Sequence, residues 1–442
     1  MKKKLIEQFF QLSFNTLDDD ICVEVDSRKI RPGMIFFALE GQKTDGHLFL
    51  QEAFDKGAVF AVVSKTKQGL PFDRLIYVDQ PAKTLQELAR FCTHSLNVPI
   101  VGITGSCGKT TTKEYISQLM KTTYRIGKTM GNYNSQIGLA IALLAMKGDE
   151  EYLVLEMGMS EKGNIASLTA MAPPTYAVLT NIGVNHIEQF GSKERIAEEK
   201  GAIFQAASCQ VAFIEKEAAT YPAIQSIKVN KQVIVAIEDH LKEGSLHIRD
   251  LVIDCKKIPL GQEQFIKNLA MAVHVALELH VPHEAILRAI DQLQTLEHRF
   301  QMIMSKRCTI IDDSYNSSLQ SLELAIASLS KKVVHGRKIA VIGAFAEQGE
   351  LEALHHDRMA DLLAGQFDEL YFIGKPAMQC ALKLNQKGHK AYYYTNLCDI
   401  VNRLNDEIQF NDLLFLKGAN QYRLWEIVDR LPAREHGVSD LA

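Results

Sequence analysis

The sequence lacks the features that mark membrane proteins, secreted proteins and metal scaffolds. No stretch approaches the run of about 18 apolar residues that a membrane-spanning helix needs. The basic start MKKK is followed by LIEQFFQLSFNTLDDD, which charged residues interrupt and which has no small-residue cleavage site, so we expect no signal peptide. The eight cysteines are scattered and include no CxxC pair. This pattern argues against a disulfide framework or a zinc site and favours reduced thiols, so we expect a cytoplasmic protein without a membrane span.

The sequence also lacks an excess of charge of one sign. Its 49 lysines and arginines nearly balance 53 aspartates and glutamates, which leaves a formal net charge of −4. This balance gives no general attraction to nucleic acid or to a membrane surface, so we expect neither as a partner. A polyanionic substrate must then be held by a local site. Low-complexity tracts and short repeats are absent too, so domain boundaries have to be sought in the pattern of strands and helices.

The 442 residues exceed what one hydrophobic core supports, and the pattern divides them into three α/β domains. Residues 1–97 have short apolar runs between loops with Gly and Asp, which predicts a small α/β domain ending in a helix over 82–96. In residues 98–303, VPIVGIT, YLVLEMG, TYAVLTN and QVAFIEK alternate with helical stretches, which predicts a parallel sheet, and amphipathic helices follow over 265–295. Residues 304–442 repeat the alternation with CTIIDD, KIAVIGA, ELYFIG and DLLFLKG, as in a Rossmann-like unit.

A glycine-rich turn directly follows the first strand of the middle domain and is the strongest chemical signal in the sequence. It consists of Thr104, Gly105, Ser106, Cys107, Gly108, Lys109, Thr110 and Thr111. Glycines let backbone N–H groups close around phosphate oxygens, and the N-terminus of the following helix adds partial positive charge. The Lys109 ammonium can neutralise the β and γ phosphates of ATP, and the Thr110 hydroxyl can bind Mg²⁺. The spacing is the short form TGxxGKTT, because Ile103 stands where the longer GxxxxGK[ST] pattern needs glycine.

This phosphate loop resembles the ATP loop of the Mur ligase family, the cytoplasmic enzymes that build the stem peptide of peptidoglycan. Further segments follow in that family's order over nearly the whole chain. They are GNYNSQIG (131–138), LEMG (155–158), NIGVNH (181–186), IAEEK (196–200), EHRF (297–300) and DDSYNS (312–317). The resemblance implies an ATP-dependent ligase that joins a carboxylate to an amine through an acyl-phosphate.

The resemblance also implies a metal site. In the family, a strand-end glutamate, the histidine of a TNIxxDH segment and a carbamylated lysine bind Mg²⁺. This assigns Glu156, His186 and a carbamylated Lys200 to the metal site, together with Thr110 of the phosphate loop. Glu156 also ends an apolar run at the expected carboxyl edge of the sheet, where ligand groups of α/β sheets collect. Without the family, a lysine that follows two glutamates would read as one more charge on a solvated helix face.

The same resemblance assigns side chains to ATP and to a UDP-linked substrate. Asn268, the last residue of a segment that otherwise departs from the family's HNxxN pattern, and Asp313 and Asn316 would contact the nucleotide, and Arg299 would reach its phosphates. The first domain, through DSRKIRPGMIFFALEGQKTDGH, resembles a uridine-nucleotide domain, and GNYNSQIG lies along the substrate cleft. The substrate-binding residues expected from these two segments are Asp26, Ser27, Arg28, Lys43, Thr44, Asp45, Gly46, His47, Asn132, Asn134 and Ser135.

Four segments resemble the family member that adds D-alanyl-D-alanine to a UDP-muramoyl-tripeptide. They are the DSR-containing segment, DDSYN, VIGAFAEQGE (341–350) and LFLKGANQYRLWEIV (414–428). The expected catalytic residues are Lys109, Lys200, His186 and Arg299, which together with two Mg²⁺ ions would offset charge on the phosphoryl group that ATP transfers to the tripeptide carboxylate. We expect the domains to close over ATP and exclude water from the acyl-phosphate, and we expect a monomer that acts on small molecules.

Several alternatives stay open. The preceding ligase of the family, which adds diaminopimelate or lysine to a UDP-muramoyl-dipeptide, shares the first domain and the mechanism. A folylpolyglutamate synthase shares the central fold but not the DSR-containing domain. A P-loop protein without ligase activity, either a switch or a non-catalytic nucleotide binder, is the third alternative, because Ala344 replaces an acidic residue and only Asn268 remains of HNxxN.

Overall fold

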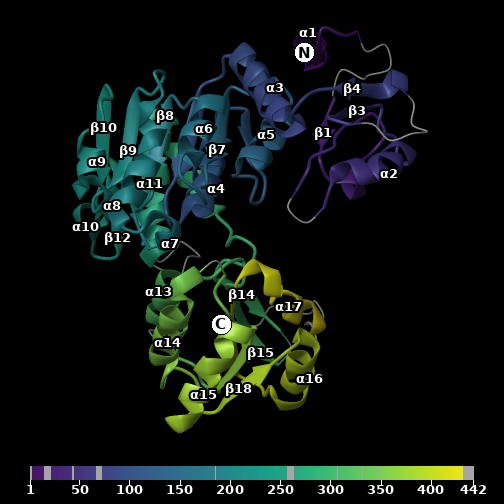
Figure 1. Ribbon diagram of the computed structural model, residues 1–442. Helices are drawn as coiled ribbons and strands as arrows, with labels where there is room; N and C mark the ends of the chain where they lie inside the picture. Colours follow the sequence, from purple (N-terminus) through teal and green to yellow (C-terminus); the bar gives the residue numbers. More distant parts are fainter. Residues whose placement is uncertain are drawn as a thin grey trace.

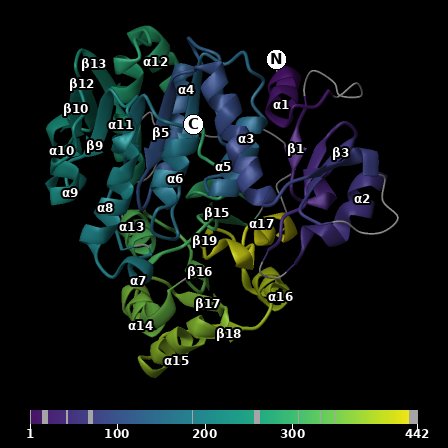
Figure 2. The ribbon, with the colours of Figure 1, turned by 45° about the horizontal axis from the view of Figure 1, so that its top comes forward.

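The structure is a computed structural model in which three α/β domains follow one another along the chain (Figure 1). The N-terminal domain lies beside the central domain, and the C-terminal domain lies across one end of the central domain in both views (Figures 1 and 2). This confirms the three-domain α/β architecture that the sequence predicts. The structure describes residues 2–13, 21–41, 44–65, 72–184, 186–255, 263–305, 307–330, 332–346 and 348–431.

The N-terminal domain is a small parallel sheet with helices packed against it. It contains α1 (Lys2–Phe10), β1 (Val23–Glu24), η1 (Ser27–Lys29), β2 (Ile35–Phe37), η2 (Gly46–Phe49), α2 (Leu50–Asp55), β3 (Phe60–Val63), η3 (Phe72–Arg74), β4 (Leu75–Tyr77) and α3 (Pro81–Leu96). The strands pair in the order β1-β2-β3-β4. Strands β2 and β3 are almost fully buried, so they read IFF and FAVV without alternation. Helix α3 corresponds to the helix predicted over 82–96. It begins with proline and ends at Asn97, which has a left-handed backbone, and it packs against α1 and the central domain.

The central domain is a six-stranded parallel sheet that carries the phosphate loop. Its elements are β5 (Ile100–Thr104), α4 (Lys109–Met120), β6 (Ile126–Lys128), α5 (Gln136–Leu144), β7 (Tyr152–Glu156), α6 (Asn164–Met171), β8 (Tyr176–Leu179), α7 (Ile187–Phe190), α8 (Lys193–Gly201), η4 (Ala202–Gln205), β9 (Val211–Glu215), η5 (Ala218–Thr220), α9 (Pro222–Gln225) and β10 (Lys231–Val235). The four strands predicted here are β5, β7, β8 and β9. The order is β10-β9-β8-β5-β7-β6, so the loops after β5, β7 and β8 meet at the switch point of the sheet, where α/β folds bind ligands.

A small antiparallel sheet and three helices complete the central domain. They are α10 (Ile237–His240), β11 (Leu241–Lys242), β12 (Ser245–Ile248), β13 (Leu251–Asp254), α11 (Glu263–Glu278) and α12 (His283–Asp291). The helices predicted over 265–295 are α11 and α12. The sequence does not predict the strands β11, β12 and β13, because runs of two to four residues are too short to show an alternation of apolar and polar side chains. Helix α11 packs along α4, which places the first turns of α11 beside the phosphate loop.

The C-terminal domain repeats the doubly wound arrangement. Its elements are β14 (Gln301–Met304), β15 (Cys308–Asp312), α13 (Leu319–Leu329), β16 (Lys338–Gly343), η7 (Gly349–Leu351), α14 (Glu352–Leu363), β17 (Glu369–Ile373), η8 (Lys375–Ala377), α15 (Met378–Gln386), β18 (Ala391–Tyr394), α16 (Leu397–Glu407), β19 (Asp412–Lys417), η9 (Asn420–Tyr422) and α17 (Glu426–Arg430). The order is β14-β15-β19-β16-β17-β18, and only β14 runs antiparallel to its neighbour. The predicted strands are β15, β16, β17 and β19.

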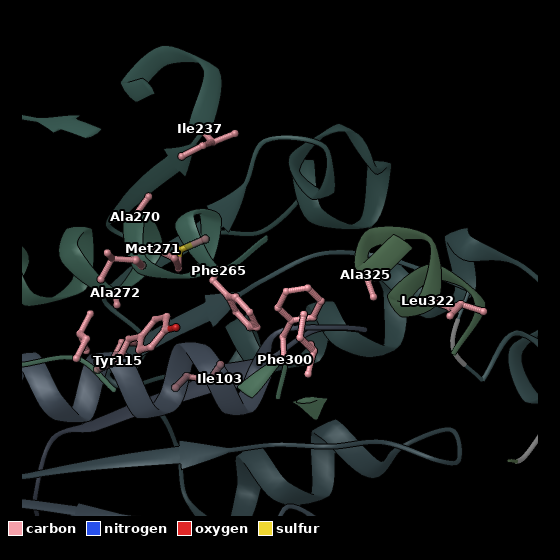
Figure 3. Close-up of a cluster of buried hydrophobic side chains, with 14 of the residues drawn as sticks. Ile103, Tyr115, Ile237, Phe265, Ala270, Met271, Ala272, Phe300, Leu322 and Ala325 are labelled. Carbon is pink, nitrogen blue, oxygen red and sulfur yellow. The ribbon is translucent and has the colours of Figure 1, made fainter. Parts of the chain in front are cut away.

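One hydrophobic core continues from the central domain into the C-terminal domain. Figure 3 shows Phe265 of α11 beside Phe300, with Tyr115 of α4 on one side and Leu322 and Ala325 of α13 on the other. Phe265 and Phe300 are buried, so the two domains share apolar contacts around the chain connection. Among the described helices, none combines the length and the apolar character that a bilayer span requires.

Candidate active site

A cavity of about 640 Å³ lies between the carboxyl ends of the central and C-terminal sheets. Clefts at this place in α/β folds are the usual ligand sites. The residues predicted from the sequence that line it are Ser106, Cys107, Gly108, Lys109, Thr110, Thr111, Asn132, Asn134, Glu156, His186, Asn268, Arg299, Asp313 and Asn316. The structure therefore brings together residues from the phosphate loop, the ends of β7 and β8, α11 and the C-terminal domain.

The phosphate loop is fixed by the residues that follow β8. The backbone N–H groups of Ser106 and Cys107 donate to Oδ1 of Asn181 over 3.0 and 2.8 Å. The Thr180 hydroxyl donates to the Cys107 carbonyl oxygen over 2.6 Å. Gly105 has a φ of +152°, and a Cβ there would lie 1.9 Å from the Thr180 Oγ1, so this position fits only glycine. The Thr-Asn pair after β8 is thus matched to the loop after β5.

Lys109 is the first residue of α4, directly after the left-handed Gly108. Its ammonium folds back over the loop and donates to the Gly105 carbonyl oxygen over 2.8 Å and to the Ser106 carbonyl oxygen over 3.4 Å. A Cβ on Gly108 would lie 2.6 Å from Oδ1 of Asn268, which places this α11 side chain against the loop. The positive charge of Lys109 and the N-terminus of α4 therefore face the space where phosphates would bind.

Glu156, at the end of β7, is hydrogen-bonded to the side chains of Thr110 and Asn134. Its Oε2 accepts from the Thr110 hydroxyl over 2.8 Å, and its Oε1 accepts from the Asn134 amide over 2.7 Å. The side chain is only 2% exposed, and the Glu156 backbone N–H donates to the Thr129 hydroxyl over 3.0 Å. Carboxylate and hydroxyl oxygens held this way have the chemistry that Mg²⁺ prefers, so the residues fit the expected cation.

His186 and Lys200 are both desolvated, and both lie within reach of the charge of Lys109. Burial, with help from the charges of Lys200 and Lys109, lowers the pKa of His186 to about 4. The imidazole is therefore neutral near pH 7, the form that can bind a metal. Lys200 is 2% exposed, and its burial, together with the charge of Lys109, holds the pKa of its ammonium well below the usual range. Two of the predicted metal ligands thus lie near the phosphate lysine.

The residue before Lys200 shows why that lysine is buried. The Glu199 carboxylate accepts from the backbone N–H groups of Gly163 and Ile165, each over 2.8 Å, at the N-terminus of α6. This is the position where a carboxylate satisfies unpaired helix donors. The end of α8 is therefore held inward by Glu199, so the IAEEK segment ends in the protein interior instead of forming a solvated helix face.

The C-terminal domain contributes a buried ion pair and a cation to the opposite wall. Lys417, at the end of β19, is 1% exposed, and its ammonium lies 2.6 Å from the Asp313 carboxylate. It also donates to the Asn316 carbonyl oxygen over 3.2 Å. The Arg299 guanidinium lies 4.2 Å from the centre of the Tyr315 ring, a cation–π contact that aligns it beside the cavity.

The chain enters the C-terminal domain through a tightly held connector. His298 and Phe300 both have left-handed backbones, with φ of +59° and +51°. The His298 ring nitrogen Nδ1 lies 2.6 Å from the buried Asp312 carboxylate, and its carbonyl oxygen accepts from the Tyr315 N–H over 3.0 Å. The ring also stacks on Trp425, with centroids 5.1 Å apart. These contacts fix Arg299 between two anchored residues.

The predicted residues of the first substrate segment lie in the N-terminal domain, away from the cavity. Asp26 caps η1 by accepting from the Arg28 N–H over 3.1 Å, and the Arg28 side chain is 81% exposed. The Ser27 hydroxyl donates to Glu52 over 2.9 Å. Lys29 joins this domain to the central one, because its ammonium lies 3.1 Å from the Tyr133 hydroxyl of the GNYNSQIG segment.

The second predicted substrate loop, in the N-terminal domain, is held in place by contacts between its own charged residues and Lys65. Asp45 lies 2.7 Å from His47 and 2.8 Å from Lys65, and these two neighbours, Lys65 first, hold the pKa of Asp45 well below its usual range. The His47 Nε2 accepts from the Ser64 N–H over 3.0 Å. Gly46 packs against the backbone, and Thr44 lies in the same loop, whereas Lys43 lies outside the described residues.

Some predicted residues lie near the cavity without lining it, and some contributors were missed. Thr104 is buried at the end of β5, and Ser135 caps α5 by accepting from the Gly138 N–H over 3.2 Å. Sequence reasoning did not assign roles to Asn181 or Lys417. The signal for both was a polar residue at the end of an apolar strand, in AVLTN and LFLKG.

Comparisons with known families agree along the chain. Three family models match in succession: "Mur ligase family, catalytic domain" over residues 22–92, "Mur ligase middle domain" over 103–274 and "Mur ligase, glutamate ligase domain" over 298–420. The UDP-N-acetylmuramoyl-tripeptide–D-alanyl-D-alanine ligase of Bacillus subtilis is 30% identical over 427 residues, which cover 92% of each chain. The ligase of the same name from Rickettsia prowazekii is 29% identical over 426 residues, covering 92% of this chain and 94% of the relative.

Solved structures show the same fold over nearly the full length. A crystal structure of MurF from Acinetobacter baumannii has a TM-score of 0.80 at 22% identity and covers 97% of this chain and 98% of that one. The structure of MurF ligase from Thermotoga maritima in complex with ADP has a TM-score of 0.76 at 26% identity and covers 94% of this chain and 98% of that one. The fold is therefore shared with these proteins over nearly the whole chain.

Proposed function

Because the chain belongs to the Mur ligase family, we propose that it is the ATP-dependent ligase that adds D-alanyl-D-alanine to UDP-N-acetylmuramoyl-tripeptide in peptidoglycan synthesis. Curated relatives with that name match nearly the whole chain. The observation that carries the proposal is the cavity, where the phosphate loop, the Glu156 group and Arg299 converge. The similar structure from Thermotoga maritima is in complex with ADP, which supports nucleotide binding by this chain.

The reaction we propose begins with transfer of the γ-phosphoryl group of ATP to the terminal carboxylate of the tripeptide. Lys109 would leave the loop carbonyl oxygens and contact the β and γ phosphates, and Arg299 would approach from the C-terminal domain. Mg²⁺, held by Thr110, Glu156, His186 and the carbamate of Lys200, would offset the negative charge on the transferring group. Asn268, Asp313 and Asn316 would contact the nucleotide, with Asp313 also fixing Lys417.

Carbamylation of Lys200 is supported by the environment of that side chain. Burial favours its neutral amine, whose nitrogen lone pair can attack the carbon of CO₂ and release a proton to form a carbamate. The product is an anion with two oxygen atoms, close to the positive charge of Lys109. The neutral amine is thereby converted into an anionic group that can bind a metal ion.

In the second step, the amine of D-alanyl-D-alanine would attack the acyl-phosphate carbon, and inorganic phosphate would leave from the tetrahedral intermediate. We propose that the UDP-linked substrate spans residues of the N-terminal domain and of the GNYNSQIG segment. These residues are Asp26, Ser27, Arg28, Lys43, Thr44, Asp45, Gly46, His47, Asn132, Asn134 and Ser135. We also propose a monomer whose three domains meet near residues 97 and 303.

The proposal is tested by mixing the protein with ATP, Mg²⁺, UDP-muramoyl-tripeptide and D-alanyl-D-alanine, and measuring the mass of the product. A parallel reaction contains UDP-muramoyl-dipeptide with lysine or diaminopimelate. Pentapeptide in the first reaction alone supports the proposal. Product in the second alone would assign the preceding ligase of the family, and ATP binding without product in either would indicate a non-catalytic protein.

A further inference from the structure

The central and C-terminal domains each place one side chain against a glycine of the other domain. Gln320, in the first turn of α13, lies over Gly183 in the turn after β8. A Cβ on Gly183 would lie 2.4 Å from the Gln320 Oε1. In the opposite direction, Glu188 of α7 lies over Gly349 of η7, where a Cβ would lie 1.6 Å from the Glu188 carboxylate. Both glycines therefore provide room that any other residue would fill.

Each of these contacts includes a hydrogen bond across the domain boundary. The Glu350 N–H donates to the Glu188 Oε1 over 3.0 Å, at the turn that leads into α14. The Cys107 thiol of the phosphate loop donates to the Gln320 Oε1 over 3.7 Å, a long and weak interaction. The first contact is held by a charged acceptor near helical N–H groups, and the second mainly by the fit of Gln320 into its seat.

The seat of Gln320, which Gly183 forms, is hydrogen-bonded to the phosphate loop. The Gly183 N–H donates to the Ser106 hydroxyl over 2.8 Å, and a Cβ on Gly183 would also lie 3.0 Å from the Ser106 Cβ. Because Asn181 binds the backbone of the same loop, a shift of the loop would move the Gln320 seat with it. Glu188 follows the proposed metal ligand His186 by two residues in the chain. Both contacts thus begin beside groups that ATP and its metal would touch.

We propose that Gln320 and Glu188 are positioning residues that form a two-point latch, which holds the C-terminal domain closed over the phosphate loop. Neither side chain is among those that line the cavity, so the latch acts through the domain arrangement and not by touching ATP. Its purpose rests on the proposed function, because closure keeps water away from the acyl-phosphate. Loss of the latch should therefore let ATP be consumed without formation of the amide.

The Gln320 contact can be tested with two substitutions, the second of which should relieve the effect of the first. Gly183→Ala should push Gln320 out of its seat, and adding Gln320→Ala should remove that clash, so the double variant should close better than Gly183→Ala alone. The contact with Ser106 is present in both variants and cancels in the comparison. Glu323→Ala, an exposed position on the same helix, is the matched control, and Gln189→Ala serves the same purpose for Glu188→Ala.

Closure is measured by small-angle X-ray scattering of the full chain with Mg²⁺ and a non-hydrolysable ATP analogue. The coupling of ATP consumption to ligation is measured as the amount of ADP formed per amide product. We expect Glu188→Ala to raise the ADP-to-product ratio by about fivefold, the value of one hydrogen bond of about 1 kcal/mol. Gln320→Ala should raise the same ratio by a smaller factor, because its hydrogen bond to Cys107 is weaker. We expect both to shift the scattering toward an open form, with Glu323→Ala and Gln189→Ala unchanged.

Equal scattering from Gly183→Ala and from Gly183→Ala/Gln320→Ala would overturn the Gln320 part of the latch. A Glu188→Ala variant that closes and couples like the Gln189→Ala control would overturn the other part. The scattering does not depend on the chemistry of the reaction. A chain that closes through these residues but forms no amide would therefore refute the proposed function and leave the latch in place.

Discussion

The central and C-terminal sheets are both doubly wound and face each other across the cavity. The polar side chains at their two facing edges differ in the groups that they contact. On the central edge, Lys109 donates to carbonyl oxygens of its own loop, and Glu156 accepts from a hydroxyl and an amide. On the C-terminal edge, Lys417 forms a buried ion pair with Asp313. Lys109 and Glu156 have neutral partners, which phosphates and a cation would replace with groups of opposite charge. Breaking the Lys417–Asp313 pair would instead leave a buried charge unpaired. The central edge is therefore suited to rebinding around ATP, and the C-terminal edge to staying fixed.

Lys109→Ala gives the sharpest test of the exchangeable edge. We expect ligation to fall by about 10²- to 10³-fold, because a charge aimed at the transferring group is lost. The free energy of unfolding should stay nearly the same, since the ammonium contacts only loop carbonyl oxygens. Product mass and urea unfolding measure the two effects. Retained ligation would remove the phosphate loop from the mechanism.

Lys417→Met tests the fixed edge, and its main expected effect is on stability. We expect the free energy of unfolding to fall by about 3 kcal/mol, because the Asp313 carboxylate is left without its buried partner. Urea unfolding at pH 7 measures the loss. The double variant Lys417→Met/Asp313→Leu should recover most of it, since no unpaired charge remains. A single variant as stable as the wild type would show that this edge is not fixed by the ion pair.

Lys200→Ala tests the metal side of the central edge. We expect about a 10²-fold loss of ligation, since a proposed metal ligand is removed. A short-chain carboxylic acid should restore part of the activity by supplying the missing carboxylate. The control is Lys193→Ala, an exposed position on the same helix. Full activity of Lys200→Ala without added acid would argue against the carbamate.

Asn134→Ala should give the smallest of these effects. The variant keeps Glu156 but removes the amide that orients its Oε1. We expect the Mg²⁺ concentration for half-maximal activity to rise about tenfold, with little change in the activity at saturating Mg²⁺. A magnesium titration separates the two quantities. An unchanged titration curve would show that the Glu156 carboxylate is oriented by other contacts.

The features that could be predicted from the sequence are local ones. The strands β5, β7 and β8 are continuous apolar runs, and the phosphate loop is read from eight consecutive residues. The features that were missed join distant positions. Asn181 fixes Ser106 across 75 residues, and Lys417 pairs with Asp313 across 104. No periodicity links such positions, because the contact exists only after the sheet order has brought two strand ends together.

The predicted substrate loop of the N-terminal domain shows a second limit of sequence reasoning. Asp45 and His47 were predicted to contact a substrate, and the structure shows them bonded to each other and to Lys65 and Ser64. A polar residue in a loop can bind a ligand, support its neighbours or do both, and its identity alone does not separate these roles. Only the positions of the surrounding donors and acceptors show that this loop is already well supported.

The connector at His298 has a consequence for how the enzyme opens. Its ring is bonded to Asp312 and stacked on Trp425, and its carbonyl oxygen accepts from Tyr315. These partners all belong to the C-terminal domain, so His298 and Arg299 travel with that domain as one rigid piece. We therefore expect the pivot for a rotation of that domain upstream, in residues 292–297. Arg299 lies close to this pivot, so it would move over a shorter arc than the distant parts of the domain.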